Sequence, residues 1–376
     1  MYFDHAATTF PVPEKVIEAV ANAMKSVSSA ERGSSPMALD ASRKLFEVRE
    51  KVGSLFGASP KRTIFTMNAT QSLNTVLMGL FVPGDHVITT SLEHNSVLRP
   101  LYFLESTGVE LTILDFCRPE ELLSLMEKSL KPNTKAIVMT HVSNLLGWVL
   151  PLDDVASFCR EKGILLVIDA AQSAGLLPVR ISDGVSAVCF TGHKALLGPQ
   201  GTGGFCLGSG VEVEPLLRGG TGVQTFSKVH PPQMPVRLEA GTHNLHGLAG
   251  LGAAVDLLME EGMEQRCKKE RSLRKLFYDL LKDEKDIVFY GAEEEALGVI
   301  PLNVGDLSSA EAGDWLAKEH GIVTRTGGHC APLAHEALGT KERGMIRFSF
   351  GYSNTAEEVQ QAAQVLLELI HRKGII

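Results

Sequence analysis

Two residues whose side chains could take part in a reaction each follow an apolar run that has the character of a buried strand. Asp169 comes directly after the run Ile164–Ile168, and Lys194 follows the run Ala187–Phe190 after a short Thr-Gly-His turn. A carboxylate at that depth needs a cation or several hydrogen bonds. A lysine there becomes useful if burial lowers its pKa, because its neutral amine can form a Schiff base. Each residue also has an ordinary interpretation: Asp169 as a helix N-cap, and Lys194 as a side chain that reaches solvent.

These residues need a scaffold that brings strand ends together, and the sequence predicts one. Between about residues 63 and 207, short β-rich runs alternate with helical stretches. The runs are almost continuously apolar, as strands buried on both faces are. The alternation predicts a mostly parallel sheet covered on both sides, with ligands bound at the carboxyl ends of its strands. The predicted strands cover residues 63–66, 86–90, 136–140, 164–168, 187–190 and 204–207.

Polar side chains follow three more of these strand ends. Thr70 comes after the first run, where a helix begins, and the free N–H groups of a helix start suit a phosphate. His94 and Asn144 follow the second and third runs, and Gln172 stands three residues after Asp169. Taken singly, Thr70, His94 and Asn144 are also ordinary residues of a loop or a helix start.

The combined set matches the requirements of one cofactor, pyridoxal phosphate. That cofactor needs a lysine for a Schiff base, an acid to keep its ring nitrogen protonated, a phosphate cup and a flat group over its ring. Successive strand ends provide all of these, in the order Thr70, His94, Asn144, Asp169, Gln172 and Lys194. We therefore expect a pyridoxal phosphate site, which no single residue of the set would predict.

Composition and charge exclude several other classes of protein. The chain has 376 residues, of which 44% are hydrophobic and 21% charged, as in an ordinary globular protein, and its length predicts two domains. The net charge is −8, so we expect no nucleic-acid partner. No apolar run approaches the ~20 residues of a membrane helix, and the N-terminus does not resemble a signal peptide. We expect a cytoplasmic protein with no membrane partner.

The six cysteines form no CxxC pair, so we expect no metal site. Neither a Walker A nor a G-x-G-x-x-G motif follows the strands, so we expect no nucleotide-binding fold.

Eight segments spread along the chain carry a family resemblance. They are residues 2–9, 93–94, 141–144, 169–175, 192–194, 239–242, 325–330 and 347–349. In these segments the sequence resembles the class V aminotransferase-like enzymes of fold type I, and within them the cysteine desulfurases and selenocysteine lyases. The stretch Arg-Thr-Gly-Gly-His-Cys that ends at Cys330 narrows the resemblance to the short-loop group of cysteine desulfurases.

The resemblance implies a fold and a domain organisation. The fold is α/β, a fold-type I pyridoxal-phosphate-dependent transferase with a mostly parallel, seven-stranded sheet in a large domain and a smaller α+β domain at the C-terminus. The large cofactor-binding domain would cover residues 12–250 and the small domain residues 251–376. Residues 1–11 would pack at the junction between the two domains.

The resemblance also implies a role for each site residue. Lys194 would form the Schiff base, Asp169 would pair with the ring nitrogen, and His94 would stack on the ring. Gln172 and Asn144 would contact the ring oxygen. The phosphate would be held by the backbone amide of Ala69, by Thr70, Thr191 and His193, and by Thr242 of a neighbouring subunit, which implies a homodimer.

The implied reaction converts L-cysteine to L-alanine. Arg347 and Asn144 would bind the substrate, Arg347 through the planar guanidinium that suits a carboxylate. Cys330 would attack the substrate sulfur and become a persulfide, which an acceptor protein would then receive. Lys194 and His94 would be the other catalytic residues.

Three alternatives remain open from the sequence. The short-loop motif also fits a selenocysteine lyase, which would release selenium from L-selenocysteine, and the scaffold also suits a different class V lyase or an aminotransferase. A catalytically weak scaffold that binds a sulfur-transfer partner is the third, although the complete cofactor set argues against it. The family pattern is broken at Asn95, after the Glu-His pair, and in the proline-rich segment of residues 219–238.

Overall fold

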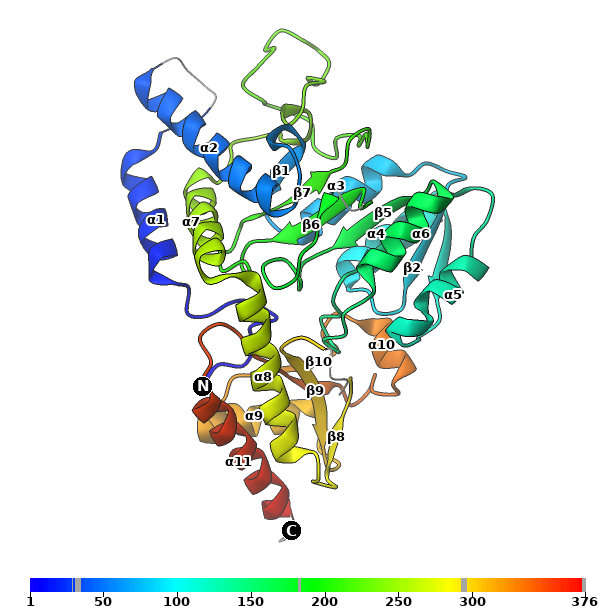
Figure 1. Ribbon diagram of the computed structural model, residues 1–376, viewed down its shortest axis with the longest axis vertical. Helices are drawn as coiled ribbons and strands as arrows, with labels where there is room; N and C mark the ends of the chain where they lie inside the picture. The colour runs from blue at the N-terminus through cyan, green and yellow to red at the C-terminus, as the bar shows by residue number, and fades with distance from the viewer. Residues whose placement is uncertain (29, 31–34, 182–183, 292–295, 374–376) are drawn as a thin grey trace.

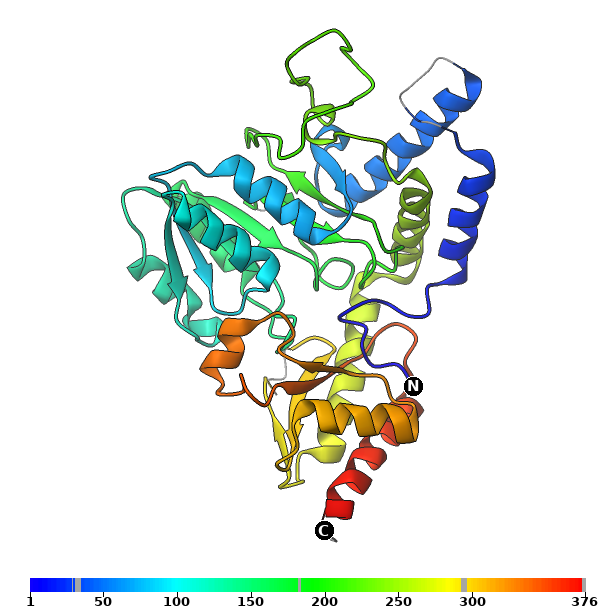
Figure 2. The ribbon, with the colours of Figure 1, turned by 180° about the vertical axis from the view of Figure 1, so that it is seen from behind.

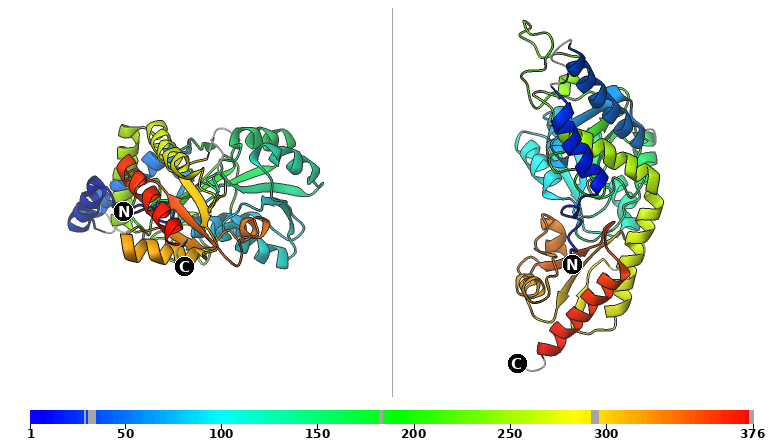
Figure 3. Two further views of the ribbon diagram at one scale, coloured as in Figure 1. Left: turned by 90° about the horizontal axis from the view of Figure 1, so that it is seen from below. Right: turned by 90° about the vertical axis from the view of Figure 1, so that its left-hand side faces the viewer.

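Two β-sheets, each covered by helices, organise the protein, and they lie one above the other along its long axis (Figure 1). This computed structural model describes residues 1–28, 30, 35–181, 184–291 and 296–373. The helices α7 (Leu245–Glu261) and α8 (Met263–Leu281) run in succession from the larger sheet to the smaller one (Figures 1 and 3). The N-terminus and the last helix, α11 (Ala356–Lys373), lie beside the smaller sheet (Figure 1).

The larger sheet has seven strands and is mostly parallel, as predicted. Its order is β1-β7-β6-β5-β4-β2-β3, in which β7 runs antiparallel to both of its neighbours and the other pairs are parallel. The strands are β1 (Thr63–Thr66), β2 (His86–Thr90), β3 (Glu110–Leu114), β4 (Thr134–Thr140), β5 (Leu165–Asp169), β6 (Ala187–Thr191) and β7 (Gly203–Leu207).

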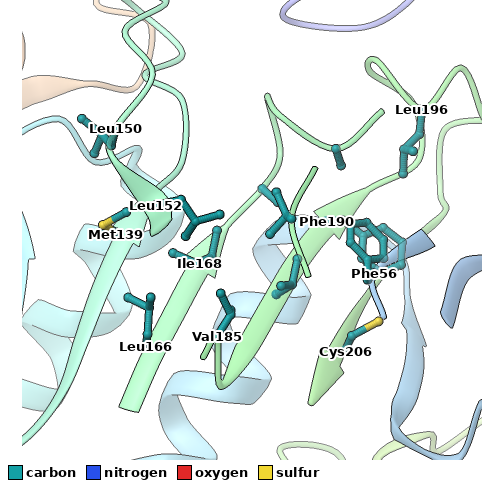
Figure 4. Close-up of a cluster of buried hydrophobic side chains, with 14 of the residues drawn as sticks. Phe56, Met139, Leu150, Leu152, Leu166, Ile168, Val185, Phe190, Leu196 and Cys206 are labelled. Carbon is teal, nitrogen blue, oxygen red and sulfur yellow. The ribbon is translucent and has the colours of Figure 1, made fainter. Parts of the chain in front are cut away.

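Side chains alternate between two hydrophobic layers along each central strand. In β5, Val167 packs on the side of α3 (Ala69–Leu80) and α4 (Asn95–Ser106). Ile168 packs on the opposite side, which also receives Phe190 and Phe56, stacked with ring centroids 4.8 Å apart (Figure 4). The helices on that side are α2 (Pro36–Leu55), α5 (Leu122–Lys128), α6 (Leu152–Lys162) and α7, and α1 (Glu14–Ser26) lies outside α7. With both faces covered, the strand ends are where polar side chains can gather.

The smaller sheet is antiparallel throughout, with the order β10-β11-β9-β8. Its strands are β8 (Ile287–Phe289), β9 (Val299–Val304), β10 (Arg325–Gly327) and β11 (Met345–Ser349). A third hydrophobic cluster, which includes Phe3, Phe277 and Phe348, joins it to α8, α9 (Ser309–His320) and α11 (Ala356–Lys373). The short helix α10 (Pro332–Ala337) follows β10, and single 3-10 turns occur at Pro60–Arg62, Pro119–Glu121 and Val236–Leu238.

The first nine residues connect the two sheets (Figure 2). The Phe3 N–H donates to Val323 O at 2.8 Å, and the Ser349 N–H of β11 donates to Phe3 O at 2.8 Å. Farther along, the Thr9 N–H donates to His193 O at 2.8 Å, in the turn that follows β6. The division into domains of residues 12–250 and 251–376 stays a prediction, and its boundary falls inside α7. None of the helices formed by the described residues combines the length and apolar character that crossing a membrane requires.

Candidate active site

Nine of the predicted site residues line one small cavity at the carboxyl ends of the central strands. The cavity has a volume of about 80 Å³. The nine residues are Ala69, Thr70, His94, Asn144, Asp169, Gln172, Thr191, His193 and Lys194, joined by Asn68, Ser96, Thr140 and Ala171. They come from the last residues of β4, β5 and β6 and from the loops or helix starts after β1, β2, β4, β5 and β6, because parallel strands direct these ends to the same edge of a sheet.

One wall of the cavity has the chemistry of an anion site. Helix α3 begins at Ala69, and its N-cap Asn68 uses its side chain to accept from the Gln71 N–H at 2.9 Å. The first N–H groups of the helix therefore point to the cavity side, where partial positive charge accumulates. The buried hydroxyl of Thr191 has no hydrogen-bond partner among the described residues. An oxygen-rich anion such as a phosphate would satisfy both kinds of donor.

Gly203 of β7 allows the start of α3 to lie close to the sheet at this wall of the cavity. A Cβ added to Gly203 of β7 would lie 2.7 Å from Asn68 Cα and 2.9 Å from Phe190 O. Both atoms belong to the backbone, so a side chain at this position would push β7 away from the start of α3. The glycine thus allows the close approach that sets the position of the helix N-terminus.

Asp169 lies at the end of β5, and its carboxylate has no cationic side chain in contact among the described residues. Its Oδ1 accepts from the Ala171 N–H at 2.9 Å, and the side chain is buried. Burial raises the pKa of Asp169, while the Ala171 N–H and the charge of Lys194 act in the opposite direction. A cationic ring N–H is the kind of partner that would stabilise this carboxylate in its charged form.

Lys194 stands in the turn after β6, which the N-terminal segment holds in place. Thr9 Oγ1 donates to Lys194 O at 2.8 Å, and Thr8 Oγ1 lies 3.2 Å from His193 Nδ1. Burial lowers the pKa of Lys194 to about 8, with Asp169 acting against the shift and Arg347 adding to it. About one-tenth of this amine is therefore neutral at pH 7, far more than of an ordinary lysine, and the neutral amine is the nucleophile.

The ring of His94 is held in one tautomer by the start of α4. The Ser96 N–H donates to His94 Nδ1 at 3.0 Å, so the proton of the neutral ring is on Nε2. Burial lowers the pKa of His94 to about 4, helped by the charge of Lys194, so the ring is neutral at pH 7. Ser96 Oγ lies 2.8 Å from both His94 Nδ1 and Thr70 Oγ1. Ser96 thus links two predicted site residues, and no sequence signal distinguishes it from an ordinary helix-start serine.

Gln172 lies in the cavity with part of its amide already engaged. Its Nε2 donates to Ala6 O at 3.0 Å, which ties the N-terminal segment to the turn after β5. The neighbouring Asn144 donates through Nδ2 to His329 O at 2.8 Å, while its buried Oδ1 has no partner among the described residues. Both amides therefore keep capacity for a bound group.

Cys330 lies in a groove that opens beside the cavity and shares Thr70, His94 and Ser96 with it. The groove has a volume of about 550 Å³. The Cys330 carbonyl accepts from the Asn95 N–H at 2.8 Å, and Cys330 has a positive φ of 56°, which is uncommon outside glycine. Arg325 Nη2 lies 3.6 Å from the sulfur and can stabilise negative charge there. The sequence did not single out Arg325, although it lies in the segment that carries the family resemblance.

Besides Cys330, two more of the predicted residues do not line the cavity. Arg347 is completely buried in β11, where Nη1 donates to Asn144 O at 2.9 Å, so it is one residue removed from the cavity wall. Its Nη2 donates to Asp4 Oδ1 at 2.7 Å, a partner that no sequence pattern predicts. Thr242 is exposed and lines a separate hollow of about 250 Å³ with His243 and His246.

Comparison with known proteins identifies the family. Residues 1–362 match the family Aminotransferase class-V, and the chain belongs to that family. The chain is 32% identical over 378 residues to a probable cysteine desulfurase of Methanothermobacter thermautotrophicus, covering 98% of this chain and 94% of the relative. A probable cysteine desulfurase of Pyrococcus abyssi is 33% identical over 386 residues, with the same coverage of 98% and 94%.

Solved structures agree with the sequence comparison. The apo structure of a cysteine desulfurase from Thermococcus onnurineus NA1 superposes with a TM-score of 0.92 at 32% identity, covering 99% of this chain and 94% of that one. The cysteine desulfurase CsdA from Escherichia coli has a TM-score of 0.87 at 28% identity, with coverage of 98% and 94%. The predicted family and fold class are thereby confirmed. Class V aminotransferases and cysteine desulfurases are generally dependent on pyridoxal phosphate.

Proposed function

We propose that the protein is a pyridoxal-phosphate-dependent cysteine desulfurase that converts L-cysteine to L-alanine and retains the sulfur as a persulfide on Cys330. The observation that supports this most directly is the position of Cys330. Its groove shares Thr70, His94 and Ser96 with the cavity that contains Lys194 and Asp169. The relatives described above are named cysteine desulfurases, and none of them favours the selenocysteine lyase alternative.

The cavity residues fit pyridoxal phosphate. Within the part of the chain that the structure describes, Asp169 has no cation in contact and the Thr191 hydroxyl is buried without a partner, while the start of α3 offers free N–H groups. When bound, pyridoxal phosphate supplies an electron sink for bond breaking at the substrate carbons. The proposed phosphate contacts are Ala69, Thr70, Thr191 and His193, and Thr242 from a partner subunit.

Lys194 and His94 would carry out the proton transfers. Because the pKa of Lys194 is lowered to about 8, Nζ can attach the cofactor as a neutral amine and then accept or return a proton. His94 is held with its proton on Nε2, and we expect its ring to lie flat over the cofactor. Asp169 would hold a proton on the ring nitrogen, and Gln172 and Asn144 would orient the ring oxygen.

Cys330 would perform the sulfur transfer. Its thiolate, stabilised by Arg325, attacks the sulfur of the bound L-cysteine, so that an S–S bond forms and the C–S bond breaks. The electron pair of the broken bond stays with the amino-acid fragment, which gains a proton and leaves as L-alanine. One L-cysteine and one thiol thus give one L-alanine and one persulfide, and no external oxidant is needed.

The proposed partners are a second copy of the chain and a sulfur acceptor protein. Thr242 is exposed, as a residue that reaches into a partner subunit must be. Residues 219–235 extend away from the body at the top of Figure 1, and Phe226 in this segment is completely exposed. Val223 and Val229 of the same segment are also exposed, and neighbouring exposed apolar side chains are typical of a surface that a partner covers. We therefore propose a homodimer in which this segment contacts the other subunit.

The function is tested by measuring alanine released from L-cysteine and from L-selenocysteine. Wild type should release alanine from L-cysteine, and Cys330→Ala should not. Cys117→Ala is the matched control, because Cys117 is also a partly exposed cysteine but lies outside the cavity and the groove. Alanine from L-selenocysteine alone would replace the desulfurase with a selenium lyase. Turnover that requires a keto acid would indicate an aminotransferase.

A further inference from the structure

The only carboxylate that forms an ion pair with Arg347 among the described residues comes from the N-terminal segment. Asp4 Oδ1 accepts from Arg347 Nη2 at 2.7 Å, and the Arg347 side chain is completely buried. On the other side of the guanidinium, Nη1 donates to Asn144 O at 2.9 Å. Arg347 Nε is buried without a partner among the described residues. A guanidinium has five N–H donors, so these two bonds fix its plane and leave other donors for a ligand.

Asp4 is held in this position by its own backbone. It forms a bridge beside Ser349 of β11, and the Ser349 N–H donates to Phe3 O at 2.8 Å. The Ala6 N–H donates to Ser349 Oγ at 2.9 Å, and Tyr2 OH donates to Thr8 O at 3.0 Å. The segment therefore lies along the strand that carries Arg347, and its carboxylate meets the guanidinium without needing a long, flexible side chain.

The charges around Arg347 give Asp4 its importance. Arg325 is the direct cross-strand neighbour of Arg347, and Lys194 is close enough for its positive charge and that of Arg347 to repel each other. Both repel a buried guanidinium, and Asp4 opposes them. Without the Asp4 carboxylate, the guanidinium would lose its attractive contact on one side and would be free to turn away from Arg325.

We propose that Asp4 is a positioning residue for substrate recognition: it fixes Arg347 so that the unused guanidinium donors face the α-carboxylate of the amino-acid substrate. The inference rests on the proposed function for the identity of the substrate. Asp4 itself would contact only Arg347. The consequence is ligand selectivity: a ligand that carries the α-carboxylate binds more tightly because of Asp4, and a ligand that lacks it does not.

The test compares two ligands that differ only in the carboxylate. L-Alanine, the product, and ethylamine, which lacks the carboxylate, are titrated into the holoenzyme, and dissociation constants are read from the cofactor absorbance. The variants are Asp4→Ala, Asp4→Asn and, as a control in the same segment, Tyr2→Phe. Tyr2→Phe removes the bonds to Thr8 O and to the backbone carbonyl of Asp4 but keeps the Asp4 carboxylate. If Asp4→Ala does not fold, Asp4→Ser is used instead, because the serine side chain is too short for its hydroxyl to reach Arg347 Nη2.

The proposal predicts a change in ligand selectivity. Asp4→Ala should weaken the binding of L-alanine by about tenfold or more, because a charge-assisted contact is lost on one side of Arg347. The dissociation constant of ethylamine should stay unchanged. Asp4→Asn keeps an acceptor oxygen but not the charge and should therefore restore only part of the difference, and Tyr2→Phe should behave as wild type. Equal weakening of both ligands, or no weakening of L-alanine, would overturn the proposal. Binding of L-alanine needs no C–S cleavage, so a failure of the desulfurase reaction would be seen separately.

Discussion

Removing the Glu239 carboxylate should destabilise the protein, because Glu239 forms a buried two-point ion pair with Arg49. Arg49 Nη1 and Nη2 lie 2.6 and 2.9 Å from the two carboxylate oxygens, and the two side chains are only 4% and 2% exposed. Glu239 also accepts from the Phe65 N–H at 2.7 Å. Glu239→Ala would leave Arg49 charged and buried with no carboxylate and would remove the acceptor of a strand N–H.

The size of the effect follows from the burial. Breaking a buried ion pair by removing one partner costs about 3–5 kcal/mol. Unfolding entropy is about 2.1 cal/mol/K per residue, so a chain of 376 residues loses about 4–6 °C in melting temperature for that change. Glu239 is three residues before Thr242, so the same variant should also loosen the segment that we propose reaches the partner subunit.

Calorimetry of Glu239→Ala beside a matched exposed pair measures this difference. Glu260 lies 2.7 Å from Lys15, but these side chains are 60% and 62% exposed. An exposed pair contributes at most about 1 kcal/mol, so Glu260→Ala should lower the melting temperature by no more than about 1 °C. If the two variants melt within about 1 °C of each other, the reasoning about Glu239 is wrong.

Three further predictions follow from the described residues. The rate at which the cofactor-free protein takes up pyridoxal phosphate should rise with pH through about 8, because burial lowers the pKa of Lys194 to that value and only its neutral amine reacts; a rate that is constant from pH 7 to 9 would contradict this. Burial lowers the folded-state pKa of His141 to about 4 and of His329 to about 3 from 6.5, so the unfolded chain binds protons first. The stability that these two histidines contribute should therefore be complete above about pH 6.5 and fall below it by up to about 1.4 kcal/mol per pH unit for each histidine. Burial raises the pKa values of Glu93 and Glu270 to about 8, which opposes this loss, so a fall in urea midpoint from pH 7 to pH 5 that is the same in wild type and in His141→Gln would refute the reasoning. Gly203→Ala should lower cofactor retention, measured by absorbance after gel filtration, because the added Cβ would lie 2.7 Å from Asn68 Cα; full retention would show that the wall can yield.

The larger sheet could be predicted because its strands are buried on both faces. Their continuous apolar runs, interrupted by helices, gave six of its seven strands. The seventh, β3, escaped because it lies at the edge of the sheet, where Glu110 and Thr112 are not buried and interrupt the apolar pattern. The strands of the smaller sheet are short and pair over long sequence separations, so local periodicity gave no reason to place them.

The sequence could predict only those site residues that follow the strands of the parallel sheet. Polar residues that follow a buried parallel strand must gather at one edge, which is why Asp169 and Lys194 line the same cavity. The pairing of Asp4 with Arg347 joins residues at opposite ends of the chain, and it depends on the path of the N-terminal segment along β11. The contact of Arg325 with Cys330 depends on the shape of one turn, which residue types alone do not specify.

The central claim is that Cys330 receives the sulfur of L-cysteine, and mass spectrometry of the protein after brief exposure to L-cysteine tests it most directly. The peptide containing Cys330 should gain the mass of one sulfur atom, in step with the alanine released, while the peptide containing Cys117 stays unmodified. Alanine release with no added sulfur on Cys330, or with the sulfur on another cysteine, would contradict it.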